Sequence, residues 1–219
     1  MIFGLIREGK TPPDRRAVLN PAQCAHLIAQ GHTIVVEPSP IRCYPDADYA
    51  AVGCIVGGDL NICDVLLGVK EVPVVELHEG ATHFFFSHTY KEQPYNRALL
   101  KACLQKHVRL IDWELLKHNG QRVIGFGLYA GLVGAYEAMR GFAQQEGQPS
   151  LPAAAELGWV ADLKKQLHAH PKGPWKVVLT GKGRVGQGAK EMLHAGGFTE
   201  VSPEAFLAHP VGDHAVFTV

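Results

Sequence analysis

Short runs of apolar residues alternate along the chain with longer segments in which apolar residues recur at helical spacing. This alternation predicts an α/β protein. The predicted strands are rich in β-branched and aromatic residues and lie at Ile2–Ile6, Thr33–Glu37, Val65–Val69, Thr82–Ser87, His107–Ile111, Trp175–Thr180, Phe198–Ser202 and Ala215–Val219. The segment Val123–Phe126 is interpreted as one more short strand or as the start of the helix that follows.

The predicted helices carry recognisable start and stop signals. Asn20 can cap a helix whose first position is Pro21, and Gly31 can end it. The other predicted helical segments are Asp46–Val52, Pro94–Lys106, Gly127–Gln145, Ala153–His170, Val185–Ala195 and Pro203–His209.

The apolar spacing of Gly127–Gln145 predicts a helix that connects two parts of the chain. We therefore expect a first domain at residues 1–126 and a second at 127–219. The stretch from Trp175 onward is about 45 residues, well below the usual domain length of about 100–150. The expected fold is two Rossmann-like domains with parallel sheets, of which the second, nucleotide-binding one is truncated. The alternative is a small variant domain completed by another chain.

Composition narrows the function classes. The 21 basic and 21 acidic residues balance, so no broad positive field favours nucleic acid. The longest apolar run, Val123–Tyr136, has about 14 residues, whereas a membrane span needs about 20. The start of the chain does not resemble a signal peptide, and the five cysteines show no CxxC spacing. We expect a cytoplasmic protein without a metal site; the composition does not indicate its oligomeric state.

Titratable side chains follow four of the predicted strands. In open α/β sheets, ligands bind outside the carboxyl ends of the strands, so these groups can converge on a small charged substrate. A guanidinium group binds a carboxylate in bidentate geometry, a role that suits Arg15 or Arg16. The strand-end groups are Arg7, Glu8, Lys10, Arg15, Arg16, Lys70, Glu71, His88, Tyr90, Lys91, Asp112 and Glu114.

Lys70 and His88 follow neighbouring predicted strands and can share proton transfer at a C–N bond. Glu71 and Glu114 can tune their pKa values. Each residue alone also fits an ordinary solvated strand end, so the hypothesis depends on their common placement at one end of consecutive strands.

The sequence Gly181-Lys182-Gly183-Arg184-Val185-Gly186 matches GxGxxG between a predicted strand and a predicted helix. In a dinucleotide-binding turn, Gly181 permits the tight bend, Gly183 lets the backbone approach a pyrophosphate, and Gly186 allows close helix packing. Arg184 and Val185 would then present the helix N-terminus to the phosphates. The alternative is a plain turn in a doubly wound sheet.

The same fingerprint calls for an acidic ribose contact about 20 residues further on. Glu200 and Glu204 lie near that distance, but Ser202 fits the place equally well. A glutamate near this distance favours NAD over NADP, although neither Glu200 nor Glu204 clearly ends a predicted strand.

Several segments resemble the alanine dehydrogenase and pyridine nucleotide transhydrogenase superfamily. Three of them are Arg-Glu-Gly-Lys at 7–10, Arg-Ala-Val-Leu-Asn-Pro at 16–21 and Gly-Val-Lys-Glu-Val-Pro at 68–73. Three more are similar to its lysine-forming saccharopine dehydrogenase branch, namely Phe-Ser-His-Thr-Tyr-Lys-Glu-Gln at 86–93, Asp-Trp-Glu-Leu-Leu at 112–116 and Arg-Val-Ile-Gly-Phe-Gly-Leu-Tyr-Ala-Gly at 122–131. Asn20 departs from the threonine usual in the family.

The resemblance implies an NAD-dependent enzyme that oxidises saccharopine to L-lysine and 2-oxoglutarate, with a small amino-acid substrate as its partner. Alanine dehydrogenase-like deamination and a non-catalytic amino-acid or nucleotide sensor are the alternatives. This chain alone is expected to be inactive. The implied roles are acid–base catalysis by Lys70 and His88, binding of substrate carboxylates by Arg16 and Arg122, pKa tuning by Glu71 and Glu114, and dinucleotide binding by Gly181, Gly183, Arg184, Val185 and Gly186.

Overall fold

The computed structural model describes residues 1–208 and 215–219. The chain divides into two compact units, Met1–Ile124 and Gly125–Val219. The helices and strands of the first unit are β1 (Ile2–Leu5), α1 (Pro21–Ala29), β2 (Thr33–Val36), α2 (Asp46–Ala51), β3 (Ile55–Val56), β4 (Val65–Leu67), β5 (Thr82–Phe85), α3 (Arg97–Gln105), β6 (Arg109–Asp112), β7 (Lys117–His118) and β8 (Gln121–Arg122). Short 3₁₀ helices lie between them: η1 (Leu60–Ile62), η2 (Val74–Glu76), η3 (Thr89–Lys91), η4 (Pro94–Asn96) and η5 (Trp113–Leu115).

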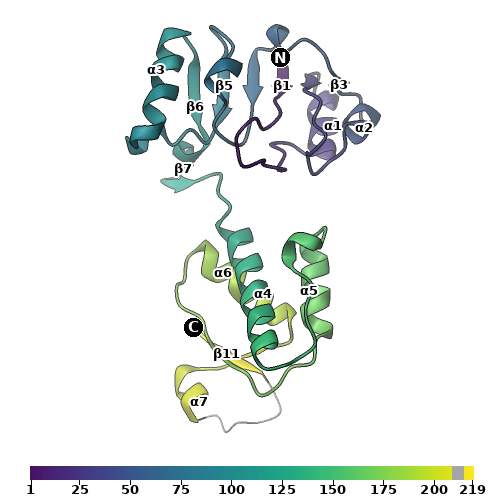
Figure 1. Cartoon of the computed structure of the whole chain (residues 1–219), viewed down its shortest axis with the longest axis vertical. Helices are drawn as coiled ribbons and strands as arrows, with labels where there is room; N and C mark the ends of the chain where they lie inside the picture. The colour runs from purple at the N-terminus through teal and green to yellow at the C-terminus, as the bar shows by residue number, and fades with distance from the viewer. Residues whose placement is uncertain (209–214) are drawn as a thin grey trace. The chain divides into compact units, whose positions relative to one another are not determined.

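The first unit is built on a six-stranded sheet of order β3-β2-β1-β4-β5-β6. Every neighbouring pair is parallel. This is the strand order of dinucleotide-binding folds, in which ligands bind where the order reverses. Here it reverses between β1 and β4, so the carboxyl ends of these strands flank the expected ligand position. The predicted α/β class with a parallel sheet is confirmed (Figure 1).

Helices cover the sheet through two apolar clusters. One joins α1 and α2 to β1 and β2 and includes Leu5, Ile34 and Tyr49. The other joins α3 to β5 and includes Phe85 and Leu99. Figure 1 shows α1 and α2 near β3, and α3 beside β6 at the other end of the sheet.

The predicted start of α1 is confirmed by a capping box. The Asn20 side chain accepts from the Gln23 N–H at 2.9 Å, the Gln23 side chain accepts from the Asn20 N–H at 2.9 Å, and Pro21 opens the helix.

Two predicted elements of the first unit are wrong in position. His107 has a left-handed backbone and Val108 donates its N–H to the Cys103 carbonyl, so the helix termination occupies residues 107–108 and β6 begins only at Arg109. No strand forms at residues 123–126 in the described structure. Instead β7 and β8 form an antiparallel hairpin around Asn119 and Gly120, whose φ values are 49° and 75°. An Asn-Gly pair favours this tight turn.

The second unit contains α4 (Gly127–Gln145), η6 (Ala154–Glu156), α5 (Val160–Ala169), β9 (Lys176–Val178), α6 (Arg184–Ala195), β10 (Thr199–Glu200), α7 (Pro203–Ala208) and β11 (Val216–Thr218). The strands form a parallel sheet of order β10-β11-β9. The predicted helix Gly127–Gln145 is confirmed, whereas the helix predicted at Ala153–His170 begins only at Val160. His209, the last residue of the predicted final helix, lies outside the described residues.

Small residues set the packing of α4 on α6. A Cβ atom at Gly131 would lie 1.9 Å from the Val185 carbonyl oxygen, and one at Gly188 would lie 2.0 Å from the Leu128 carbonyl oxygen. The two backbones therefore approach each other without room for side chains. In the part of the chain that the structure describes, no helix combines the length and the apolar character needed to cross a bilayer.

Candidate functional site

Lys70 lies at the carboxyl end of β4, where the strand order reverses. The Glu8 carboxylate, which follows β1, accepts the main-chain N–H groups of Val69 at 2.7 Å and Lys70 at 2.8 Å. Burial raises the pKa of Glu8, and these two hydrogen bonds partly oppose the rise. Glu8 thereby joins the ends of β1 and β4. Among the described residues, the Lys70 ammonium group makes no ion pair or hydrogen bond, so this cation is available to a ligand.

Arg16 lies in the long loop after β1 and pairs with Asp14. Its Nη2 atom is 2.5 Å from Asp14 Oδ2, and its Nε atom is 2.9 Å from Asp14 Oδ1. The hydrogen bond from Arg16 lowers the pKa of Asp14, and the positive charge of Lys70 lowers it further. Arg16 and Lys70 thus act on the same carboxylate. Arg15 instead donates from Nε to the Ile41 carbonyl oxygen at 3.3 Å.

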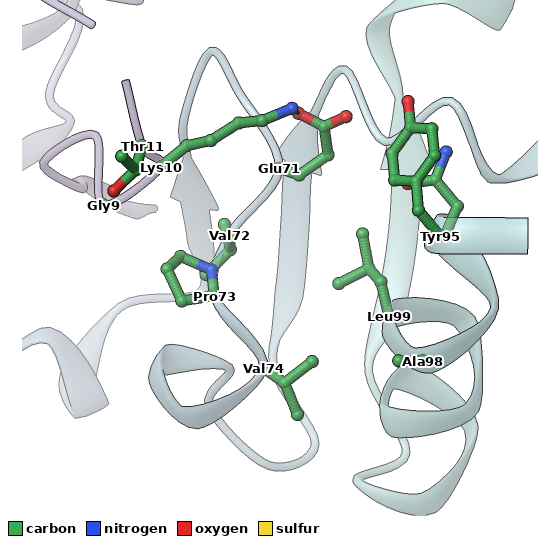
Figure 2. A pocket seen from close by; sticks show the side chains of 11 residues that line it. Gly9, Lys10, Thr11, Glu71, Val72, Pro73, Val74, Tyr95, Ala98 and Leu99 are labelled. Atoms are coloured by element: carbon green, nitrogen blue, oxygen red, sulfur yellow. Dashed lines mark hydrogen bonds and ion pairs between the residues drawn. The ribbon is translucent and has the colours of Figure 1, made fainter. Parts of the chain in front are cut away.

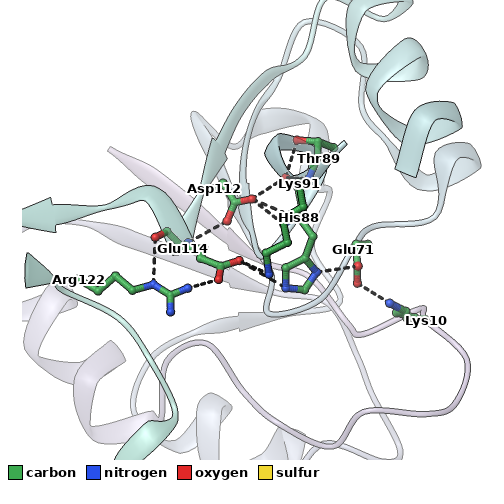
Figure 3. Close-up of polar contacts among 9 residues, drawn as sticks. Lys10, Glu71, His88, Thr89, Lys91, Asp112, Glu114 and Arg122 are labelled. Atoms are coloured by element: carbon green, nitrogen blue, oxygen red, sulfur yellow. Dashed lines mark hydrogen bonds and ion pairs between the residues drawn. The ribbon is translucent and has the colours of Figure 1, made fainter. Parts of the chain in front are cut away.

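His88 lies between two carboxylates at the end of β5 (Figure 3). Its Nδ1 atom is 3.1 Å from Glu71 Oε1, and its Nε2 atom is 3.7 Å from Glu114 Oε2. On the far side of Glu71, the Lys10 ammonium group is 2.6 Å from Oε2. Burial by itself raises the pKa of Glu71, but the hydrogen bonds from Lys10 and His88 outweigh it, and the pKa is lowered. Glu71 is therefore an anion facing the imidazole ring at neutral pH.

Glu114 is held by cations on its other side. Lys91 Nζ lies 2.9 Å from Glu114 Oε2, and the Arg122 guanidinium contacts Oε1. Arg122 also donates from Nε to the Glu114 carbonyl oxygen at 3.2 Å. Burial raises the pKa of Glu114, whereas hydrogen bonding to Lys91 and the charge of Arg122 lower it below the usual value. Charges therefore alternate in sign on both sides of the His88 ring.

The structure thus connects four of the predicted residues of the first unit through side-chain contacts. Glu71, His88, Glu114 and Arg122 form a continuous polar chain, and Lys70 lies next to Glu71 in the sequence. Arg16 pairs with Asp14, and both Arg16 and Lys70 lower the pKa of Asp14. The roles of these residues remain predictions.

Three residues that the sequence placed at strand ends without a role contact this polar chain: Lys10, Lys91 and Asp112. A fourth, Glu8, binds the main chain of Lys70. Asp112 accepts the main-chain N–H of Glu114 at 2.8 Å, which is an Asx turn. An Asp two residues before a Glu, directly after a strand, is the sequence signal that could have identified this turn.

A cavity of about 310 Å³ adjoins the Lys10–Glu71 ion pair (Figure 2). Lys10 and Glu71 lie at one side of it, and Val72, Val74 and Leu99 contribute apolar walls. Glu71 therefore contacts the His88 ring with one oxygen, Lys10 with the other, and an open pocket beside the ion pair.

The glycine-rich turn of the second unit lies between β9 and α6. Gly181 has φ +94°, Gly183 is the N-cap of α6, and a Cβ atom at Gly186 would lie 1.9 Å from the Gly181 carbonyl oxygen. A Cβ atom at Gly181 or Gly183 would meet nothing within 4 Å. The first residues of α6, Arg184 and Val185, are exposed. The turn therefore presents open backbone and a helix N-terminus, the donor set that suits a pyrophosphate.

Glu200, one of the candidates for the ribose contact, ends β10. Its carboxylate lies 2.7 Å from Lys190 Nζ and 3.2 Å from His194 Nε2. The hydrogen bond from Lys190 lowers the pKa of Glu200, so it is an anion at neutral pH. β11 lies between β10 and β9, so Glu200 is not on the strand beside the one that carries the glycine turn.

Comparison with known proteins places these features in a family. Residues 4–133 match the model of the alanine dehydrogenase/PNT N-terminal domain. The chain is 32% identical over 227 residues to an alpha-aminoadipic semialdehyde synthase of Arabidopsis thaliana, covering 92% of this chain and 21% of that protein. It is 31% identical to the NAD(+), L-lysine-forming saccharopine dehydrogenase of Candida glabrata, covering 88% of this chain. The chain spans 57% of that dehydrogenase.

Solved structures show the same fold at lower sequence identity. An L-alanine dehydrogenase aligns with a TM-score of 0.61 at 19% identity, over 100% of this chain and 61% of that chain. A transhydrogenase from Sinorhizobium meliloti aligns with a TM-score of 0.63 at 20% identity, over 100% of this chain and 64% of that chain. The family model covers more than half of the chain, so the chain belongs to the alanine dehydrogenase/PNT N-terminal domain family.

Proposed function

We propose that the protein containing this chain is an NAD-dependent oxidoreductase that acts on the C–N bond of an amino acid, with saccharopine as the favoured substrate. The observation that carries the proposal is the His88 ring, held between the carboxylates of Glu71 and Glu114 at the sheet edge that also bears Lys70. A ring that contacts a carboxylate at one nitrogen and faces another across 3.7 Å can gain or lose a proton without leaving its place.

Relatives support the choice of substrate. The names of two fungal relatives, from Candida glabrata and Emericella nidulans, state saccharopine, NAD(+) and L-lysine formation, and both are 31% identical to this chain. Saccharopine is a secondary amine that carries several carboxylates, so a site for it needs cations as well as acid–base groups. Arg16 and Arg122 supply guanidinium groups, and the Lys70 side chain has no ion-pair partner in the described structure.

The glycine turn of the second unit fits the dinucleotide. Gly186 cannot carry a side chain because of the Gly181 carbonyl oxygen, and the open backbone at Gly181 and Gly183 leaves room for phosphates. NAD would accept a hydride from the carbon that bears the secondary amine, which leaves an imine on the substrate.

The residues of the first unit would then hydrolyse the imine. In its neutral amine form, Lys70 takes a proton from the substrate amine before oxidation, and His88 takes a proton from the water that adds to the imine carbon. Cleavage of the C–N bond returns a proton to the departing lysine amine and leaves the carbonyl group of 2-oxoglutarate. Arg16 and Arg122 bind substrate carboxylates, and the anionic Glu71 and Glu114 stabilise the protonated ring of His88.

The proposal is tested by NADH formation with the whole gene product, offered saccharopine and alanine side by side at mildly alkaline pH. Turnover with saccharopine is the expected result. Turnover with alanine alone would overturn the assignment of saccharopine as the substrate and leave the reaction class unchanged. Tight amino-acid or nucleotide binding without any turnover would overturn the proposal of an enzyme and favour a non-catalytic sensor.

Replacing Lys70 with Met tests its role within that assay. Loss of a general base should lower turnover by about 100-fold or more. Lys101→Met is the matched control, because Lys101 is an exposed lysine on α3 and should leave turnover unchanged. Equal turnover of the two variants would remove Lys70 from the acid–base mechanism.

A further inference from the structure

Asp112 is a buried carboxylate at the end of β6, 7% exposed. Among the described residues it has no cation within ion-pair distance. Instead it accepts four hydrogen bonds. Oδ2 accepts from Ser87 Oγ at 2.7 Å, from the His88 N–H at 3.0 Å and from the Ser87 N–H at 3.2 Å, and Oδ1 accepts from the Glu114 N–H at 2.8 Å. One side chain therefore binds the main chain at two separate points of the candidate site.

The first point is the backbone of His88. This residue has φ 55° and ψ 10°, a left-handed conformation that residues with a Cβ atom rarely adopt. Such a conformation persists only where the surrounding contacts determine it. The His88 N–H is fixed by Asp112, and the imidazole Nδ1 is fixed by Glu71. Asp112 thus holds the main-chain bend from which the ring reaches both carboxylates.

The second point is the start of η5. By accepting the Glu114 N–H, Asp112 fixes the turn that directs the Glu114 carboxylate toward His88 Nε2. The turn is also tied to the end of β4, because Trp113 donates from Nε1 to the Gly68 carbonyl oxygen at 2.7 Å. One side chain, that of Asp112, therefore fixes the main chains that carry the His88 ring and the Glu114 carboxylate (Figure 3).

We propose that Asp112 is a positioning residue for acid–base chemistry, which it serves by fixing the geometry of His88 and Glu114 together. It does not face the substrate and transfers no proton. This inference rests on the proposed function, because positioning matters for turnover only if His88 takes part in it. A displacement of about 1 Å at a catalytic group can cost about 100-fold in rate.

Asp112→Asn tests the proposal with little change of shape. An amide has one accepting oxygen in place of two, so it cannot accept from both the His88 and the Glu114 main chains through separate oxygens. The matched control is Asp59→Asn, because Asp59 caps η1 in the same way, accepting the Asn61 N–H at 2.9 Å, but contacts no residue of the site.

Kinetics of the whole gene product give the first readout. Asp112→Asn should lower kcat by about tenfold or more while KM changes by less than about threefold, since the groups that bind substrate carboxylates are untouched. The shape of its pH profile should also differ from that of the wild type, because the carboxylates facing His88 no longer have fixed positions. Asp59→Asn should keep the wild-type kcat and profile. A folded Asp112→Asn protein with wild-type kcat and pH profile would overturn the proposal.

Hydrogen exchange on this chain gives a second readout that needs no turnover. Asp112→Asn should speed amide exchange at residues 87–88 and 114 together, and Asp59→Asn only near residue 61. If Asp112→Asn does not fold, Ser87→Ala removes one of the four donors and should give a smaller kcat loss with faster exchange at His88. Unchanged exchange and kcat in that variant would also overturn the proposal. Faster exchange at both points with no amino-acid turnover in the wild type would refute the proposed function and leave the positioning geometry standing.

Discussion

The two candidate sites of this chain are built in opposite ways. In the first unit, His88, Glu71 and Glu114 are charged or titratable side chains that hold one another at the ends of strands. In the second unit, Gly181 and Gly186 form a site from main-chain atoms, and the Gly181 carbonyl oxygen leaves no room for a side chain at Gly186. The site of the first unit thus consists of side chains, and that of the second unit consists of main-chain atoms at glycine positions.

This difference predicts how each region responds to substitution. In the first unit the carboxylates of Glu71 and Glu114 each have more than one partner, so loss of one contact leaves others in place. In the second unit, contacts such as that of Gly131 with Val185 are between backbones, which cannot turn aside like a flexible side chain. We therefore expect graded effects in the first unit and all-or-none effects in the second.

The largest effect is expected for Gly131→Ala in α4. The new methyl group would lie 1.9 Å from the Val185 carbonyl oxygen and 2.8 Å from the Ala189 nitrogen, so α4 and α6 must separate. We expect the free energy of unfolding of the second unit to fall by about 3 kcal/mol or more. Urea unfolding followed by hydrogen exchange in each unit measures this, and a loss below about 1 kcal/mol would refute the backbone contact.

A smaller effect is expected from acid in the first unit. His83 is fully buried in β5, and burial lowers its pKa to about 4. Between pH 6.5 and 4 the unfolded chain binds a proton at this residue that the folded chain does not, so stability falls as the pH falls through this range. The contribution lost is at most about 3 kcal/mol.

Unfolding of the first unit at several pH values between 4 and 7 measures this loss. His83→Phe should flatten the dependence, and the exposed His118→Asn should leave it unchanged. The same slope in wild type and His83→Phe would show that another group is responsible.

Lys10→Met should cost less, about 1 kcal/mol at neutral pH, because Lys10 is 37% exposed and Glu71 keeps its contact with His88. The pKa of Glu71 is lowered in the folded state, so its favourable contribution is present above the usual carboxyl range and is lost as the pH falls. The difference between wild type and Lys10→Met should therefore shrink in acid. A double-mutant cycle with Glu71→Gln isolates the pair, and a coupling near zero would contradict the ion pair.

The smallest effect is expected for Gly134→Ala, also on α4. A Cβ atom there would meet nothing within 4 Å, so only the helix propensity changes. We expect a gain of about 0.5–1 kcal/mol in the second unit. Thermal unfolding of Gly134→Ala beside Gly131→Ala compares the two glycines directly. Losses of similar size in both variants would show that the close backbone contact at Gly131 does not set the effect.

Local signals in the sequence predicted much of the fold. Asn20 and Pro21 mark the start of α1, and apolar runs mark the strands that precede Lys70 and His88. Such features depend on residues close together in the chain, or on a regular period, and one sequence displays both. The Asn119-Gly120 pair is also a local signal, because Asn-Gly favours a tight hairpin turn.

Other features depend on distant pairs and have no local signal. Asp112 accepts a hydrogen bond from Ser87, which lies 25 residues away in the sequence, and no local sequence pattern predicts this contact. Gly131 and Gly188 are understood only when α4 and α6 are seen to touch, because each glycine alone fits a weak helix position. The glycine fingerprint can be read from the sequence. The strand order β10-β11-β9, which separates Glu200 on β10 from the glycine turn after β9, cannot.

The hydrogen bond from Trp113 to the Gly68 carbonyl oxygen has an optical consequence. Trp113 is the single tryptophan of residues 1–124, and its indole lies 4.9 Å from the Phe84 ring, centroid to centroid. The other two tryptophans, Trp159 and Trp175, belong to the second unit. With both replaced by Phe, the emission of the remaining indole would report on the strand end that carries Lys70. The chain thus contains its own fluorophore for following a ligand at that edge without any added label.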